Sequence, residues 1–178
     1  MFVGSIYSNP ELLVEYIQLV KSKYDFYDES TRFFYDCAET MYQTRSQEFK
    51  NNTIVAFMSE DKERLDLFKK YGGIKLIDSW KKLSQPENQK NYYDILKKYS
   101  LLREYQRKGF DITGILKHSK FETFTANDIY RLVRGKADKI HTVILGSSET
   151  EVLNKGTKKT LLDHMAKPSI LADRKSVV

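Results

Sequence analysis

Cysteine, proline and glycine are all scarce in this chain of 178 residues. The single cysteine, Cys37, excludes an internal disulfide framework. Three prolines and eight glycines are too few for the many turns of a β-sandwich or a β-barrel. No apolar run approaches the roughly 18 residues that a membrane-spanning helix requires, and the first residues lack the basic start and long apolar stretch of a secretory signal. The composition therefore predicts a cytoplasmic protein that is neither a β-sandwich nor a β-barrel.

Motifs for catalysis, cofactor binding and metal binding are also missing. The segment from Gly156 to Thr160 superficially resembles a phosphate-binding loop, but it lacks the first glycine five positions earlier and a preceding strand. The three histidines lie on separate segments without the spacing of metal ligands. Cys37 falls in a helical apolar pattern, which favours a small buried residue over a nucleophile. We predict no catalytic, cofactor or metal site in this chain.

Charge is unevenly distributed along the chain. Residues 1–61 contain 5 Lys and Arg against 10 Asp and Glu, whereas residues 62–178 contain 25 against 14. The first third therefore has a net charge of −5 and the remainder one of +11. A basic surface of this kind can attract nucleic acid or an acidic partner, although the lysines form no compact cluster in the sequence. The charge pattern leaves two interpretations open, a solvated helical surface and a polyanion-binding surface.

The first 44 residues predict three helices separated by short breaks. Asn9 is expected to cap the second helix and Pro10 to occupy its first position, because proline has no N–H to satisfy there. Asp28 is expected to cap the third helix. Apolar residues recur at helical spacing in both helices. They are Leu12, Leu13, Tyr16, Ile17 and Val20 in the second and Phe33, Phe34, Cys37 and Met41 in the third.

Adjacent glycines mark the middle of the chain. Gly72 and Gly73 can end one helix in a left-handed turn and let the next helix start at once. Ile77 and Trp80 follow at helical spacing, and we expect Trp80 to lie in the core. Residues 54–58 are predicted as either a short helix or an extended segment, since periodicity does not separate the two.

Two long amphipathic helices are predicted from about residue 91 and from about residue 126. Thr125 and Asp128 have the spacing of a capping box at the start of the second. A short connection makes such helices antiparallel neighbours, and a hairpin of two helices cannot bury both of its apolar faces alone. We therefore predict an oligomer interface on the two apolar stripes. Its residues are Tyr92, Ile95, Tyr99 and Leu102 on the first helix and Ile129, Val133, Ala137 and Ile140 on the second.

The order of these blocks resembles the N-terminal domain of the DnaB-like replicative DNA helicases of bacteria and phages. The resemblance covers residues 2 to about 145, and Leu76 stands where the family has a tyrosine. The matching residues are Val3, Gly4, Ser5, Ile6, Pro10, Glu11, Leu12 and Leu13; Asp25, Phe26, Tyr27, Asp28, Arg32 and Phe34; Gly72, Gly73 and Ile77; and Tyr92, Ile95, Leu101, Leu102 and Arg103. The resemblance implies an all-α fold with a small helical head at residues 1–88, an antiparallel helical hairpin at 89–145, and a linker with a short docking helix at 146–178.

The resemblance also implies a role in DNA replication. In the family, six such domains pair into a trimer-of-dimers collar that binds the primase and helicase loaders and shapes the channel for single-stranded DNA. The linker helix docks on a neighbouring subunit, which suggests this role for Leu161, Leu162 and Met165 here. ATP and Mg²⁺ would bind in a motor domain that is absent from this sequence. We therefore expect a fragment of a longer helicase, with no cofactor of its own.

Two other interpretations remain open. The helicase-interaction domain of bacterial primases shares this helical arrangement. The chain could instead be a stand-alone basic DNA-binding or regulatory protein that uses its basic two-thirds. The twelve tyrosines suit either a protein interface or stacking on single-stranded DNA, and their helical spacing favours the interface.

Overall fold

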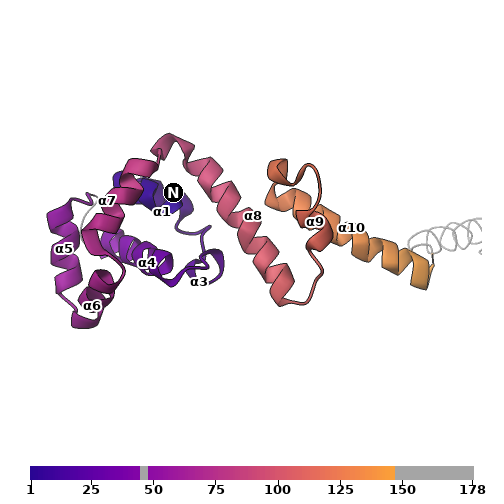
Figure 1. The fold of residues 1–178 in the computed structure, drawn as a ribbon, viewed down its shortest axis with the longest axis horizontal. Helices are drawn as coiled ribbons and strands as arrows, with labels where there is room; N and C mark the ends of the chain where they lie inside the picture. The colour runs from indigo at the N-terminus through magenta and orange to yellow at the C-terminus, as the bar shows by residue number, and fades with distance from the viewer. Residues whose placement is uncertain (45–47, 147–178) are drawn as a thin grey trace, which may run out of the picture. The chain divides into compact units, whose positions relative to one another are not determined.

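The computed structural model describes residues 1–44 and 48–146. That part of the chain contains ten α-helices, two short 3₁₀ helices and no β-strand, so the predicted all-α fold is confirmed (Figure 1). The helices are α1 (Phe2–Ser8), α2 (Leu12–Tyr16), α3 (Ser22–Asp25), α4 (Glu29–Thr44), α5 (Asn51–Ser59), α6 (Lys62–Lys70), α7 (Gly73–Leu83), η1 (Pro86–Asn88), α8 (Gln89–Arg107), α9 (Thr113–Leu116), η2 (Phe121–Thr123) and α10 (Ala126–Leu145).

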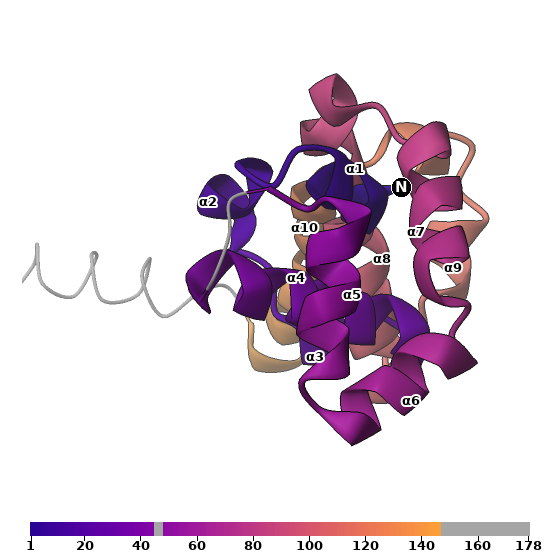
Figure 2. The same cartoon turned by 90° about the vertical axis from the view of Figure 1, so that its left-hand side faces the viewer.

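Helix α1 lies at the centre of the core. Its residues from Phe2 to Tyr7 are all buried, and it contacts α2, α4, α7 and α8. The ring of Phe2 packs edge-on against that of Tyr16, with 5.5 Å between the centroids, and the Tyr7 hydroxyl donates a hydrogen bond to the Phe34 carbonyl at 2.9 Å. Figure 2 views this arrangement from the side on which α5 and α6 lie. An apolar N-terminal helix is therefore enclosed by the helices that follow it.

Two predicted helix caps are confirmed. The Asp28 carboxylate accepts the backbone N–H of Thr31 at 2.8 Å at the start of α4. At the start of α10, the N–H of Thr125 donates to the Asp128 carboxylate at 2.9 Å, and the N–H of Asp128 donates to the Thr125 hydroxyl at 3.2 Å. Both caps satisfy backbone donors that the first turn of a helix leaves without an intrahelical partner.

The second helix differs from its prediction at both ends. It begins at Leu12 instead of Pro10, because the Asn9 side-chain oxygen accepts the N–H of Glu11 at 3.3 Å and holds these residues in a turn. It ends at Tyr16, whose carbonyl accepts the N–H groups of both Leu19 at 2.9 Å and Val20 at 2.8 Å, so that a single turn follows the helix. The apolar spacing up to Val20 reflects burial in the core and not a continuous helix.

The glycine pair acts as predicted. Gly72 and Gly73 have φ angles of +100° and +57°, which lie in the left-handed region, and they join α6 directly to α7. Residues 51–59 form α5, so the choice left open for residues 54–58 is decided in favour of a helix. Trp80 is partly buried and packs against the core, with its ring 5.3 Å from that of Phe34 in an edge-on arrangement.

The chain divides into two compact units, residues 1–130 and residues 131–178. Helix α8 belongs to the first unit, where it contacts α1 and α3. The Ser100 hydroxyl of α8 donates to the Tyr24 carbonyl at 3.1 Å, and the Arg103 guanidinium donates to the Asp25 carbonyl at 2.5 Å. Helix α8 is thus hydrogen-bonded to the end of α3. The domain boundaries near residues 88 and 145, and the antiparallel packing of the two long helices, stay predictions.

Candidate protein-interaction site

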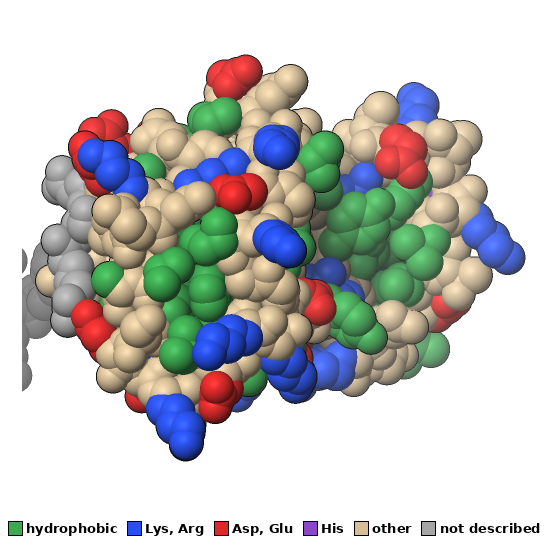
Figure 3. Space-filling model, turned by 60° about the vertical axis from the view of Figure 1, so that its left-hand side comes forward, with side chains coloured by type: hydrophobic (Ala, Val, Ile, Leu, Met, Phe, Trp, Pro, Cys, Tyr) green, Lys and Arg blue, Asp and Glu red, His purple; other side chains and the backbone are tan. Residues whose placement is uncertain are grey.

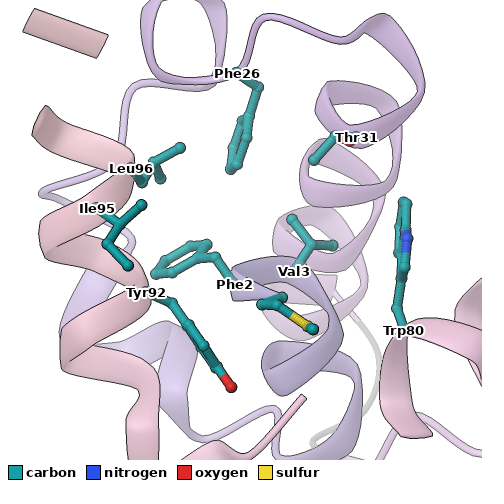
Figure 4. Close-up of a pocket in the computed structure, with 9 residues that line it drawn as sticks. Phe2, Val3, Phe26, Thr31, Trp80, Tyr92, Ile95 and Leu96 are labelled. Atoms are coloured by element: carbon teal, nitrogen blue, oxygen red, sulfur yellow. The ribbon is translucent and has the colours of Figure 1, made fainter. Parts of the chain in front are cut away.

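An open apolar groove lies where α8 meets the N-terminal helices. It has a volume of about 410 Å³, and Figure 4 shows the rings of Phe2 and Phe26 between α8 on one side and α4 on the other. Two of the predicted interface residues, Tyr92 and Ile95, belong to its lining. The complete lining is Met1, Phe2, Val3, Phe26, Thr31, Trp80, Tyr92, Ile95 and Leu96.

The local structure of α1 positions this groove. Gly4 allows α1 to approach α7 closely, because a Cβ atom at this position would lie 2.6 Å from the carbonyl oxygen of Trp80. On the opposite side, the Tyr92 hydroxyl accepts the backbone N–H of Gln85 at 3.2 Å, and the Gln89 side chain donates to the Phe2 carbonyl at 3.4 Å. Hydrogen bonds to backbone groups therefore fix the position of the Tyr92 side chain and of the start of α8 beside α1.

The exposed part of α8 extends the apolar surface. Ile95 is 45% exposed and Tyr99 is 41% exposed, although the Tyr99 ring also lies edge-on to that of Phe121 at 6.3 Å. In the space-filling view, hydrophobic side chains gather in patches with lysines and arginines between them (Figure 3). Such patches on a helical surface are typical of protein contact sites.

Two predicted interface residues are buried within the chain itself. Leu102 and Ile129 are 3% and 0% exposed. Ile112, Ile115 and Phe121 are buried as well, and none of these five residues belongs to the main core cluster. The side chains of Leu102 and Ile129 are covered by their own chain and are not accessible to a second copy. The assignment of the eight residues to an interface stays a prediction, with its accessible part on α8 at Ile95 and Tyr99.

Lys98 is buried and binds backbone carbonyls of residues 121 and 122, a contact that sequence reasoning missed. Its ammonium donates to the carbonyl oxygens of Phe121 at 2.6 Å and Glu122 at 3.3 Å, and it lies 4.0 Å from the centroid of the Phe121 ring. A lysine is rarely buried unless its charge is compensated. Nothing in the sequence indicated that Lys98 would be buried. The two carbonyls belong to the segment between the two long helices.

The second unit presents the remaining predicted residues on α10. Val133 is partly buried, whereas Ala137 and Ile140 are exposed, Ile140 by 65%. Val143 and Ile144 continue the apolar stripe and are exposed as well. The stripe therefore reaches beyond the residues predicted for it. Leu161, Leu162 and Met165, which were predicted to dock as a linker helix, lie outside the described residues, as does the segment from 156 to 160.

Chemically reactive groups are few in the described part of the chain. Burial raises the pKa of the Cys37 thiol to about 12, so it is protonated at neutral pH and is a poor nucleophile. Residues 1–44 and 48–146 contain no cluster of His, Cys, Asp and Glu that could hold a metal ion. None of the helices in these ranges is long and apolar enough to cross a membrane.

Comparison with known proteins gives no relative: no protein-family model, curated protein or solved structure matches this chain.

Proposed function

We propose that this chain is a collar domain of a DnaB-like replicative DNA helicase, which joins subunits and recruits partners in DNA replication. The resemblance in the order of sequence blocks supports this proposal. The observation that carries it is the apolar surface of α8 around Ile95, beside a groove of about 410 Å³. An apolar groove with an exposed isoleucine at its rim is suited to receive a side chain from another protein.

Burial of apolar area would drive the association of two copies through this surface. Burial of apolar area stabilises a complex by about 25 cal/mol per Å², and a stable interface buries about 800 Å² on each partner. The exposed apolar residues of α8 and, separately, those of α10 would contribute contacts between copies. Lysines and arginines around them would form the polar rim of the interface. In the ring, the dimer would be the repeating unit.

The remaining roles follow from the collar proposal. The groove or its rim would bind the primase or the helicase loader in the bacterial or phage-infected cytoplasm. Single-stranded DNA would pass through the assembled ring. ATP and Mg²⁺ would act in a separate motor domain. The collar domain would position subunits and partners and would not catalyse a reaction.

Charge substitution in the exposed apolar surface tests the proposal. We expect the double variant Ile95→Glu with Ile140→Glu to lose its oligomer, as measured by light scattering, while circular dichroism shows unchanged helix content. Ile95 is preferred to Leu102 here because glutamate at the buried Leu102 would unfold the subunit. Val55→Glu on α5 is the matched control, since Val55 is similarly exposed at 41%. An unchanged mass in the double variant, or an equal loss in the control, contradicts the proposed interface.

A further inference from the structure

A second groove, of a different chemical character, lies between α3 and the C-terminal half of α8. It has a volume of about 480 Å³ and shares only Phe26 with the apolar groove. Four basic side chains and one carboxylate line it, which leaves a net charge of +3. The basic residues are Lys23, Arg32, Arg103 and Arg107, and the carboxylate is Glu104. A concentration of cations in a hollow of this kind attracts an anionic ligand.

Two of these arginines are held in place by the backbone. The Arg32 guanidinium donates to the Phe26 carbonyl at 3.2 Å, and that of Arg103 donates to the Asp25 carbonyl at 2.5 Å. Each of these bonds uses one of the five N–H donors of a guanidinium. Further donors remain for a ligand, and little side-chain freedom would be lost when it binds.

The third arginine, Arg107, forms an ion pair with Glu104. The two carboxylate oxygens of Glu104 accept hydrogen bonds from Arg107 at 3.1 Å and 2.6 Å. Tyr24 lines the same groove as this pair. An exposed ion pair contributes little to stability. A phosphate can therefore replace the Glu104 carboxylate on Arg107 at small cost.

Tyrosine rings complete the groove. Tyr24 is 50% exposed and Tyr27 is 83% exposed, and the Lys23 ammonium lies 5.8 Å from the centroid of the Tyr24 ring. An exposed ring beside cations is the arrangement with which proteins bind single strands, because bases stack on the ring while phosphates contact the cations.

We propose that this groove binds single-stranded nucleic acid, with phosphates on Lys23 and the arginines and a base stacked on Tyr27. An acidic peptide would use the same cations but would leave the rings unused. A duplex keeps its bases stacked inside and would leave the rings unused as well. The proposal does not depend on oligomer formation, since every residue involved belongs to one chain.

Binding of a fluorescent oligothymidylate of about 12 nucleotides to the full chain, followed by anisotropy, tests the stacking contact. Replacement of Tyr27 by Ala removes the ring and should weaken binding by about 5- to 100-fold. Tyr27→Phe keeps the ring and should bind like the wild type. Tyr130→Ala is the control, because Tyr130 is an exposed tyrosine, at 49%, that lies outside the groove. An equal loss of affinity in Tyr27→Ala and Tyr130→Ala contradicts the proposed binding site.

A salt titration tests the phosphate contacts separately. Lys23→Ala should reduce the slope of log affinity against log salt by about 0.7, whereas Lys75→Ala on the exposed surface of α7 should leave it unchanged. Glu104→Gln frees Arg107 and should tighten binding severalfold.

Three outcomes overturn the proposal. The first is a wild-type chain that does not bind the oligonucleotide at about 50 mM salt. The second is a slope that Lys23→Ala and Lys75→Ala change equally. The third is a polyglutamate peptide that binds wild type and Tyr27→Ala equally well and more tightly than the oligonucleotide, which assigns the groove to an acidic peptide. Light scattering of the same variants separates this result from the collar proposal, because none of them alters the apolar surface.

Discussion

The Lys97 ammonium of α8 lies 2.6 Å from the Asp25 carboxylate at the end of α3. Asp25 is 3% exposed, and the same oxygen accepts the backbone N–H of Lys21 at 2.7 Å. The ion pair joins residues 72 positions apart in the chain. Together with the hydrogen bonds of Gln89, Ser100 and Arg103, it holds α8 against the N-terminal helices.

Loss of Lys97 should destabilise the fold strongly. In Lys97→Met the Asp25 carboxylate stays buried with a backbone N–H as its remaining partner, and loss of one member of a buried pair costs about 3–5 kcal/mol. We expect a value near 3 kcal/mol in urea unfolding, because the Lys97 side chain is itself 26% exposed. Arg134→Met is the control, since its pair with Asp138 is exposed and should contribute less than about 1 kcal/mol. Equal losses in the two variants would show that the Asp25 pair is solvated.

The glycines at positions 4 and 135 should respond oppositely to alanine. In Gly4→Ala the new methyl group would lie 2.6 Å from the Trp80 carbonyl oxygen, and overpacking of this kind costs about 1–3 kcal/mol. Gly135 lies within α10 and has no atom within 4 Å of the corresponding position. Gly135→Ala should therefore increase helix content by circular dichroism, because alanine favours an exposed helix by about 1 kcal/mol over glycine. A Gly4→Ala variant as stable as the wild type would mean that α1 and α7 are farther apart.

Acid should remove the contribution of Asp28. Its pKa is lowered mainly by the hydrogen bond from the Ser30 hydroxyl and also by the N–H of Thr31. A lowered pKa means that the contribution is fully present above the usual value of 3.8 and is lost as the pH falls through the lowered value. Asp28→Ala should cost about 1 kcal/mol at neutral pH, and its difference from wild type in urea unfolding should shrink near pH 2. A difference that is independent of pH would assign the effect to packing.

Local signals in the sequence predicted the helix boundaries that depend on backbone chemistry. Asp28, the Thr125 and Asp128 pair, and the left-handed glycines at 72 and 73 each act within a few residues of their own position. Such features are readable from sequence because spacing alone determines which groups can meet.

Features that depend on distant contacts were not predicted. Lys98 is buried because the chain returns near Phe121 and supplies two carbonyls, and a helical pattern does not reveal this return. Leu102 has the same spacing as Ile95 and Tyr99, yet the first is buried and the other two are exposed. Periodicity identified the apolar face of α8 but not which part of it the chain itself would cover. The basic groove beside α3 escaped notice for the same reason, because Lys23 and Arg107 are far apart in sequence.

The mass of the wild-type chain in solution tests the collar proposal most directly. Light scattering over a range of protein concentrations should give a mass of at least twice the 20.9 kDa of one chain, because in the collar proposal a second copy would cover the exposed apolar residues. A chain that stays monomeric at high micromolar concentration would contradict the account, and would favour a monomeric adaptor of the primase type.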